Sequence, residues 1–177
     1  MSRPQGVQSG SAGNTVDATL CAHSGTTIER RYTVADLQRL REAGAQLGTA
    51  FDAHFQFSQL ESRVAIEGEL RGVMVLTCQR CMKPFEWTLD EQFQVTLVRS
   101  ETELDSETGD YEAIVADPVR LDLQALAEDQ ALLALPLVPK HVSETCEDEQ
   151  APVESAASEV ETTQRPFGNL RDLLRGH

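Results

Sequence analysis

The residues best spaced for metal binding or thiol chemistry in this sequence are two cysteines three positions apart, Cys78 and Cys81. Thiolates at this spacing can hold one soft metal ion or form one small disulfide ring. Cys146 and His141 could complete a tetrahedral set of three sulfurs and one nitrogen, which is typical of zinc. The alternative is a tight turn whose cysteines pack or stay free, with Cys146 unrelated to it. From the sequence both interpretations remain open.

A thiol redox role is a weaker interpretation of the same pair. In thioredoxin-like proteins the two cysteines open a helix that follows a strand. Here the pair is followed by Pro84 and by an alternating apolar pattern, which predicts a returning strand. Redox chemistry would also require a lowered thiol pKa at Cys78 or Cys81.

Several basic residues near predicted strand ends are candidate contacts to RNA or to a protein partner. Lys and Arg contacts to phosphate provide most of the sequence-independent affinity for RNA. An exposed Phe85 or Trp87 could stack on an unpaired base. The alternative is that these aromatic rings belong to the core and that the cations are scattered. The candidate cations are Arg71, Arg80, Lys83 and Arg99.

Adjacent carboxylates at Glu128 and Asp129 do not predict catalysis. Neighbouring side chains on a helix point about 100° apart, so these two cannot serve one substrate as an acid/base pair. One of them is expected to bind a backbone amide or an arginine. No nucleophile–base pair and no phosphate-binding loop is present in the sequence, so we expect a protein that is not an enzyme.

The acidic charge is unevenly distributed. The net charge of −14 at first argues against nucleic acid as a partner. However, residues 101–117 and 144–161 each hold seven acidic residues and no basic one, whereas residues 30–99 hold nine of each sign. The acidic segments therefore resemble solvated loops, and the centre of the chain is close to neutral.

The elements that must position these residues follow from periodicity. Residues 1–26 are small and polar, which predicts a disordered leader with no secretory signal. A strand is expected at 27–32 and a short helix at 34–45. Alternating patterns then predict about five antiparallel strands, with a break at Gly72 and a bend at residues 90–91. The predicted core residues are Phe55, Phe57, Ile66, Val75 and Val95.

The C-terminal part begins with an acidic loop at 101–110 and an edge strand at 111–115. Asp122 is then in a position to cap a helix that ends near Pro136. An acidic linker and an amphipathic tail are expected over 147–177. The predicted fold is α+β: an antiparallel β-sheet or small, partly open barrel packed by one or two helices, with flexible termini. The predicted α+β domain spans residues 27–146.

Four ordered blocks of the sequence lie at residues 76–85, 121–136, 141–146 and 166–170. Together they resemble the YceD family, the bacterial large ribosomal RNA subunit accumulation proteins, and the resemblance spans about residues 27–174. It implies a role in the synthesis, processing or accumulation of large-subunit (23S) ribosomal RNA. It implies no established catalytic residue.

These observations lead to one expected function and one alternative. We expect a cytoplasmic ribosome biogenesis factor that acts by non-catalytic binding, with large-subunit ribosomal RNA or a ribosomal protein as its partner. Neither a membrane nor a small-molecule substrate is expected. The alternative is an acidic adaptor for a basic partner such as a ribosomal protein. Zinc is the cofactor that the cysteine and histidine set would bind.

Overall fold

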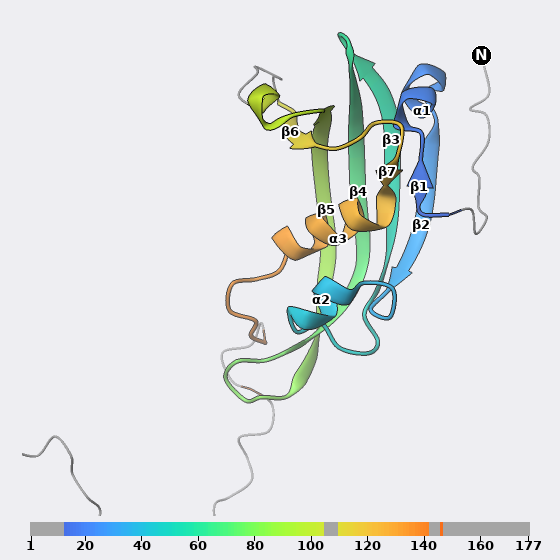
Figure 1. Cartoon of the computed structure of the whole chain (residues 1–177). Helices are drawn as coiled ribbons and strands as arrows, with labels where there is room; N and C mark the ends of the chain where they lie inside the picture. The colour runs from blue at the N-terminus through green and yellow to red at the C-terminus, as the bar shows by residue number, and fades with distance from the viewer. Residues whose placement is uncertain (1–12, 105–109, 142–145, 147–177) are drawn as a thin grey trace, which may run out of the picture. The chain divides into compact units, whose positions relative to one another are not determined.

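The computed structural model describes residues 13–104, 110–141 and 146. A five-stranded sheet has the order β2-β3-β4-β5-β6, and the helices lie on one of its faces (Figure 1). The five strands are β2 (Thr27–Thr33), β3 (Ala50–Leu60), β4 (Arg63–Thr77), β5 (Pro84–Val98) and β6 (Glu112–Val115). The other elements are β1 (Thr15–Val16), α1 (Ala18–Ser24), α2 (Gln38–Glu42), the 3₁₀ turn η1 (Glu101–Glu103), β7 (Leu121–Asp122) and α3 (Leu123–Leu133).

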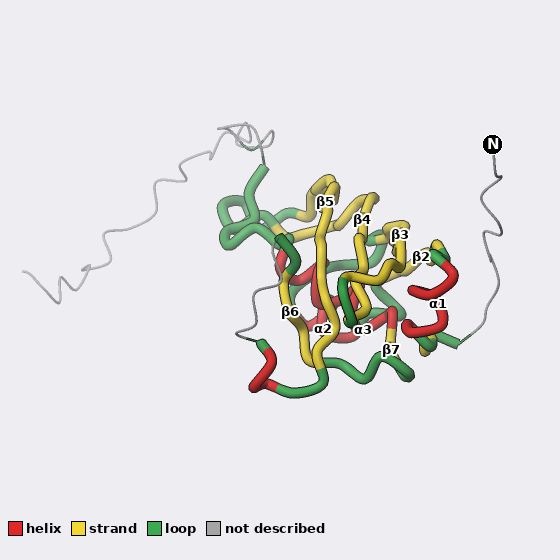
Figure 2. Tube along the Cα trace, turned by 90° about the horizontal axis from the view of Figure 1, so that it is seen from above, coloured by secondary structure: helices red, strands yellow, loops and turns green. Residues whose placement is uncertain are grey.

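The α+β prediction is confirmed. Strands β2 to β5 form an antiparallel meander, and β6 adds to β5 in the parallel direction. The described residues form an open sheet rather than a closed barrel, because the strand order has two ends. Seen from above, the helices lie below the sheet on one side (Figure 2). Four of the five predicted core residues, Phe55, Phe57, Ile66 and Val95, are at most 1% exposed.

Strand β4 continues through Gly72, so the predicted break there is wrong. A side chain at this position would meet the backbone of β3, since an added Cβ would lie 2.5 Å from Phe51 Cα and closer still to the Ala50 carbonyl oxygen. Because the strand is unbroken, its even-numbered residues keep facing the helices. Met74 therefore occupies the core, and Val75 is only half-buried, which corrects its predicted place.

Strand β5 is equally regular. Its register with β4 runs without interruption from Thr77 opposite Pro84 to Ala65 opposite Thr96. The bend predicted at residues 90–91 is absent from this ladder, because Asp90 and Glu91 are paired like their neighbours. The acidic pair reflects solvent exposure at the middle of the strand rather than a bulge.

The opposite face of the sheet carries a row of alternating charge across four strands, which we call the charge row. Arg31 lies opposite Asp52, Asp52 opposite Arg71, and Arg71 opposite Asp90. Arg31 and Asp52 approach to 3.2 Å, and Arg71 contacts Asp90 at 3.3 Å. The side chains are about two-thirds exposed, so each pair contributes little free energy on its own.

The predicted disordered leader is incorrect for residues 13–26. Strand β1 pairs with β7, more than a hundred residues away, with Thr15 opposite Asp122. Helix α1 follows, and its N-cap residue Asp17 accepts a hydrogen bond from the Leu20 amide at 3.1 Å. Ala18 is fully buried against the sheet. The segment has small residues and no apolar periodicity, and its strand partner is distant in the sequence, so neither helix nor strand was predicted here.

Helix α2 is shorter than the predicted 34–45 helix. The Asp36 carboxylate accepts from the Thr33 amide and hydroxyl, and this contact closes a turn before the helix begins. The N-cap residue Leu37 makes no side-chain cap. Glu128 of α3 supplies the missing acceptor instead and binds the Leu40 amide at 3.0 Å. The neighbouring Asp129 pairs with Arg39 of α2.

Helix α3 matches its prediction closely. The Asp122 carboxylate caps it by accepting from the Gln124 and Ala125 amides at 2.9 and 3.2 Å. Within the described residues, no helix has the length and apolar character that crossing a bilayer demands. The predicted linker and tail at 147–177 and part of the acidic loop, residues 105–109, lie outside the described residues.

Candidate metal centre

The turn between β4 and β5, residues 78–83, carries the first two thiols. The Cys78 amide donates to the Lys83 carbonyl at 2.9 Å, and the Met82 amide donates to the Cys78 carbonyl at 2.9 Å. Met82 takes a positive φ of 59°, which lets the chain reverse before Pro84. Because this reversal is tight, Cys78 and Cys81 both lie on the turn; Cys78 is fully buried and Cys81 half-buried.

The segment that follows α3 brings the imidazole to this turn. The Gln79 amide donates to the Pro139 carbonyl at 2.8 Å, so residues 139–141 run beside the turn. His141 then places its Nδ1 3.6 Å from the Cys81 sulfur. The His141 ring also packs on Phe85 with the ring centres 5.0 Å apart.

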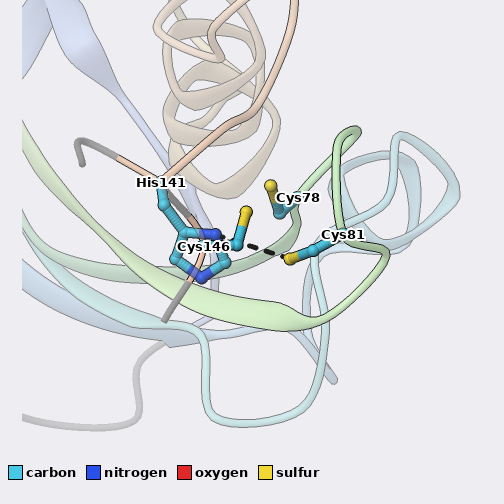
Figure 3. Close-up of side chains that lie close together, drawn as sticks. All are labelled: Cys78, Cys81, His141 and Cys146. Atoms are coloured by element: carbon cyan, nitrogen blue, oxygen red, sulfur yellow. Dashed lines mark hydrogen bonds between the residues drawn. The ribbon is translucent and has the colours of Figure 1, made fainter. Parts of the chain in front are cut away.

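Four donor atoms converge at this point. The sulfurs of Cys78, Cys81 and Cys146 and a nitrogen of His141 all lie within 4.8 Å of one another (Figure 3). None of the four cysteines is in a disulfide, and Cys146 is buried. The sequence-based set of three sulfurs and one nitrogen is therefore assembled, and it could hold a metal ion.

The Cys78 thiol is poised to lose its proton. Burial alone would raise its pKa, but hydrogen bonds from the backbone amides of Cys81, Arg80 and His141, and from the His141 side chain, outweigh that effect. The pKa of Cys78 falls from 9.0 to about 5. A thiolate is the form that binds metals, so the turn stabilises the ligand in its binding state.

The spacing of the donors fits a tetrahedral ion. With Zn–S near 2.3 Å and Zn–N near 2.1 Å, a sulfur and a nitrogen on one tetrahedral zinc ion lie about 3.6 Å apart. The Cys81 sulfur and His141 Nδ1 already have this separation. No two of the four donor atoms are more than 4.8 Å apart, which is about 1 Å beyond the separation of two sulfurs on a tetrahedral zinc ion. The residues present therefore fit a four-coordinate metal.

The candidate cations do not all lie at this turn. Arg80 and Lys83 are exposed on the turn itself. Arg71 lies within β4 in the charge row, where it contacts Glu69 at 2.5 Å as well as Asp90. Arg99 follows β5 at the opposite end of the sheet, as the register of β4 with β5 requires. Their roles toward RNA or a partner remain predictions.

Sequence reasoning missed one basic residue near the turn. Lys140 is exposed and stands between Pro139, which accepts from the turn, and His141. The order of Pro139, Lys140 and His141 was visible in the sequence, but the contact of this segment with residues 78–83 was not. Phe85 and Trp87 are half-buried and pack against the core, so neither is a freely exposed stacking surface.

Comparisons with known proteins point in one direction. The family model described as "Large ribosomal RNA subunit accumulation protein YceD" matches residues 66–174. A curated protein of Haemophilus influenzae with the same description is 32% identical over 118 residues, which is 66% of this chain and 68% of the relative. No solved structure is significantly similar to the chain. The family match includes the turn, helix α3 and His141.

Proposed function

The chain belongs to the YceD family, and from this membership we propose that it supports the accumulation of large-subunit ribosomal RNA by non-catalytic binding in the cytoplasm. The observation that carries the proposal is the family match, which covers most of the described domain. The chain would bind 23S RNA either directly or through a ribosomal protein. No catalytic step is part of the proposal.

Direct contact with RNA would involve the turn at residues 78–83. Arg80, Lys83 and Lys140 place three positive side chains around it, whereas Arg71 lies within β4 and Arg99 at the other end of the sheet. Phosphate contacts from Lys and Arg give affinity without sequence specificity. We therefore propose that Arg80, Lys83 and Lys140 contact the phosphate backbone of the RNA.

Zinc is the ion that we propose for the metal centre. Three thiolates and one imidazole favour zinc over the harder ions that prefer oxygen. When bound, zinc would supply coordinate bonds that join the turn to His141 and Cys146, with every position filled by protein. Cys78, Cys81 and Cys146 would provide the sulfurs and His141 the nitrogen. The site would therefore be structural and would fix the basic turn in place.

The lowered pKa of Cys78 also meets one requirement of a thiol redox protein. Its burial opposes that function, because Cys78 is 0% exposed and a redox thiol must reach its substrate. The turn also leads into strand β5 rather than into a helix. Metal binding therefore accounts better for the same thiolate.

The test measures ribosomal RNA and chain-bound RNA in the same cells. Depletion of the chain should lower the ratio of large- to small-subunit ribosomal RNA, and the wild-type chain should restore it. A double variant, Arg80→Glu with Lys83→Glu, should recover less large-subunit RNA in ultraviolet crosslinking and should restore the ratio poorly. The matched control, Arg63→Glu with Arg99→Glu, makes the same charge change at the other end of the sheet.

Two outcomes separate the alternatives. If the Arg80→Glu, Lys83→Glu variant loses crosslinked RNA while the control retains it, direct binding through residues 78–83 is supported. If neither variant changes the RNA but ribonuclease treatment leaves a basic protein attached to the chain, the adaptor function replaces direct binding. An unchanged ratio of the two RNAs on depletion would contradict the whole proposal.

A further inference from the structure

Strand β6 forms one edge of the sheet (Figures 1 and 2). Among the described residues its only strand partner is β5, with Ile114 opposite Leu97. The Ala116 amide, just after the strand, donates to the Val98 carbonyl at 2.9 Å. Since amide directions alternate along a strand, the Ala113 and Val115 amides point to the other side, away from β5.

An apolar groove lies beside this edge. It has a volume of about 540 Å³ and runs between β6 and α3. Its walls include Ile114, Leu126, Leu132 and Leu133, and the Arg39–Asp129 pair lies at its margin. Leu133 is 72% exposed although it belongs to a helix that packs on the sheet. The groove can therefore receive apolar side chains from a strand placed along β6.

The surroundings of the edge are acidic. Among the described residues between 99 and 120, five are acidic and two, Arg99 and Arg120, are basic. The acidic ones are Glu101, Glu103, Asp110, Glu112 and Asp117. Charge complementarity therefore favours a guest with a basic sequence and disfavours an acidic one.

We propose that β6 and the adjacent groove bind an extended, basic segment of a partner protein that adds a strand to the sheet. Main-chain hydrogen bonds to Ala113 and Val115 would hold the guest strand, and every second side chain would enter the groove. Lys and Arg residues between these positions would face the acidic margin. This surface lies apart from residues 78–83, so the proposal goes beyond RNA contact and does not depend on it.

The probe is a library of random 12-residue linear peptides displayed on phage and selected against the full-length chain. Enriched peptides should carry a net positive charge and aliphatic residues at alternate positions. Their affinity should fall as salt concentration rises, because the acidic margin is exposed. In amide hydrogen exchange, the Ala113 and Val115 amides should exchange rapidly in the free chain and become protected with a synthesised peptide bound.

Two variants test the groove and the edge separately. Leu133→Glu should weaken peptide binding at least tenfold, and its control Leu47→Glu, at a leucine that is 86% exposed and does not line the groove, should not. Ala113→Pro removes an outward amide that would bind the guest strand, so it should also weaken binding tenfold. The fold should tolerate this change, because proline is accepted on a strand edge. Ala113→Val retains the amide and should bind normally. Circular dichroism checks that each variant is folded.

Three results would overturn the proposal. The first is a selection that yields no peptides, or only neutral or acidic ones. The second is binding that survives both Leu133→Glu and Ala113→Pro. The third is a chain that forms dimers in light scattering and loses them with Ala113→Pro, because the edge would then pair with a second copy.

Discussion

Cys78 combines complete burial with a stabilised negative charge. In the unfolded chain its thiol has the ordinary pKa of 9.0, whereas in the folded chain the pKa is about 5. The folded state therefore binds fewer protons between these two values. The stability that this thiolate contributes is fully present above pH 9, decreases as the pH falls, and is lost as the pH passes through about 5.

This pKa can be measured on chain freed of metal. The ultraviolet absorbance of thiolate, taken as the difference between wild-type chain and Cys78→Ser, should titrate with a midpoint near pH 5. Cys21→Ser is the control, since burial and Asp17 raise the pKa of Cys21 and its removal should leave the acidic step unchanged. A difference titration centred near pH 9 would show that the amide hydrogen bonds do not stabilise the thiolate.

The metal centre predicts a stoichiometry. Chain purified without chelators should contain about one zinc ion, with Zn–S distances near 2.3 Å in X-ray absorption. Cys81→Ser, Cys146→Ser and His141→Ala should each lower the zinc content, because each removes one of four ligands. Cys21→Ser should retain it, since Cys21 lies on α1 outside the set. Zinc content near zero in wild-type chain would exclude the site.

At the level of elements, Glu128 links α3 to α2. Its carboxylate accepts from the buried Leu40 amide, which has no acceptor from the N-cap residue of its own helix. Glu128→Ala should cost about 1–3 kcal/mol in the free energy of unfolding, since a buried donor is left unsatisfied. Glu128→Gln should cost less, because an amide oxygen still accepts. Asp129→Ala, at a half-exposed pair, should cost under about 1 kcal/mol in urea denaturation.

Strand β4 makes a second prediction at this level. Gly72→Ala would drive a Cβ into Ala50 and Phe51 of the neighbouring strand, so both strands must shift. We expect a loss of about 1–3 kcal/mol in chemical denaturation. Gly13→Ala is the matched control, because nothing lies within 4 Å of an added Cβ there. Equal stability of the two variants would mean that β3 and β4 separate at low cost.

Period-two alternation was enough to predict the sheet and four of its five core residues. It failed at Val75 because a glycine in an alternating run can mark either a strand end or a close approach between strands. At Gly72 the approach of Phe51 decides, and that contact is tertiary. The sequence also did not reveal that residues 14–24 are folded, because β1 is stabilised by pairing with β7 and not by its neighbours in sequence.

The donor set was predictable from residue types, but its assembly was not. Spacing alone pairs Cys78 with Cys81, whereas His141 reaches them through the hydrogen bond from Gln79 to Pro139. The lowered pKa of Cys78 depends on amide directions in the turn, which residue types do not reveal. Lys140 was missed for the same reason.

For the molecule as a whole, the uneven charge limits how strongly it can bind RNA. Three cations near residues 78–83 would displace few counterions, so the slope of log affinity against log salt should be about −2 to −3 for large-subunit ribosomal RNA. Arg80→Glu with Lys83→Glu should make the slope shallower, and Arg63→Glu with Arg99→Glu should leave it unchanged. A filter-binding series over salt concentration measures it. A slope steeper than about −5 would require cations beyond these three.

The charge row also affects which register the strands adopt during folding. A slip of one residue would turn a strand's apolar side chains to solvent, but a slip of two would keep them inside and needs another safeguard. In one direction, that slip would place Glu29 opposite Asp52, Asp52 opposite Glu69, and Glu69 opposite Asp90, at three successive strand junctions. Directly opposed like charges destabilise, whereas native opposite-charge pairs each contribute about 0.2–1 kcal/mol. Ion pairs that add little to the stability of the sheet thus disfavour this two-residue slip, which burial of apolar side chains alone would permit.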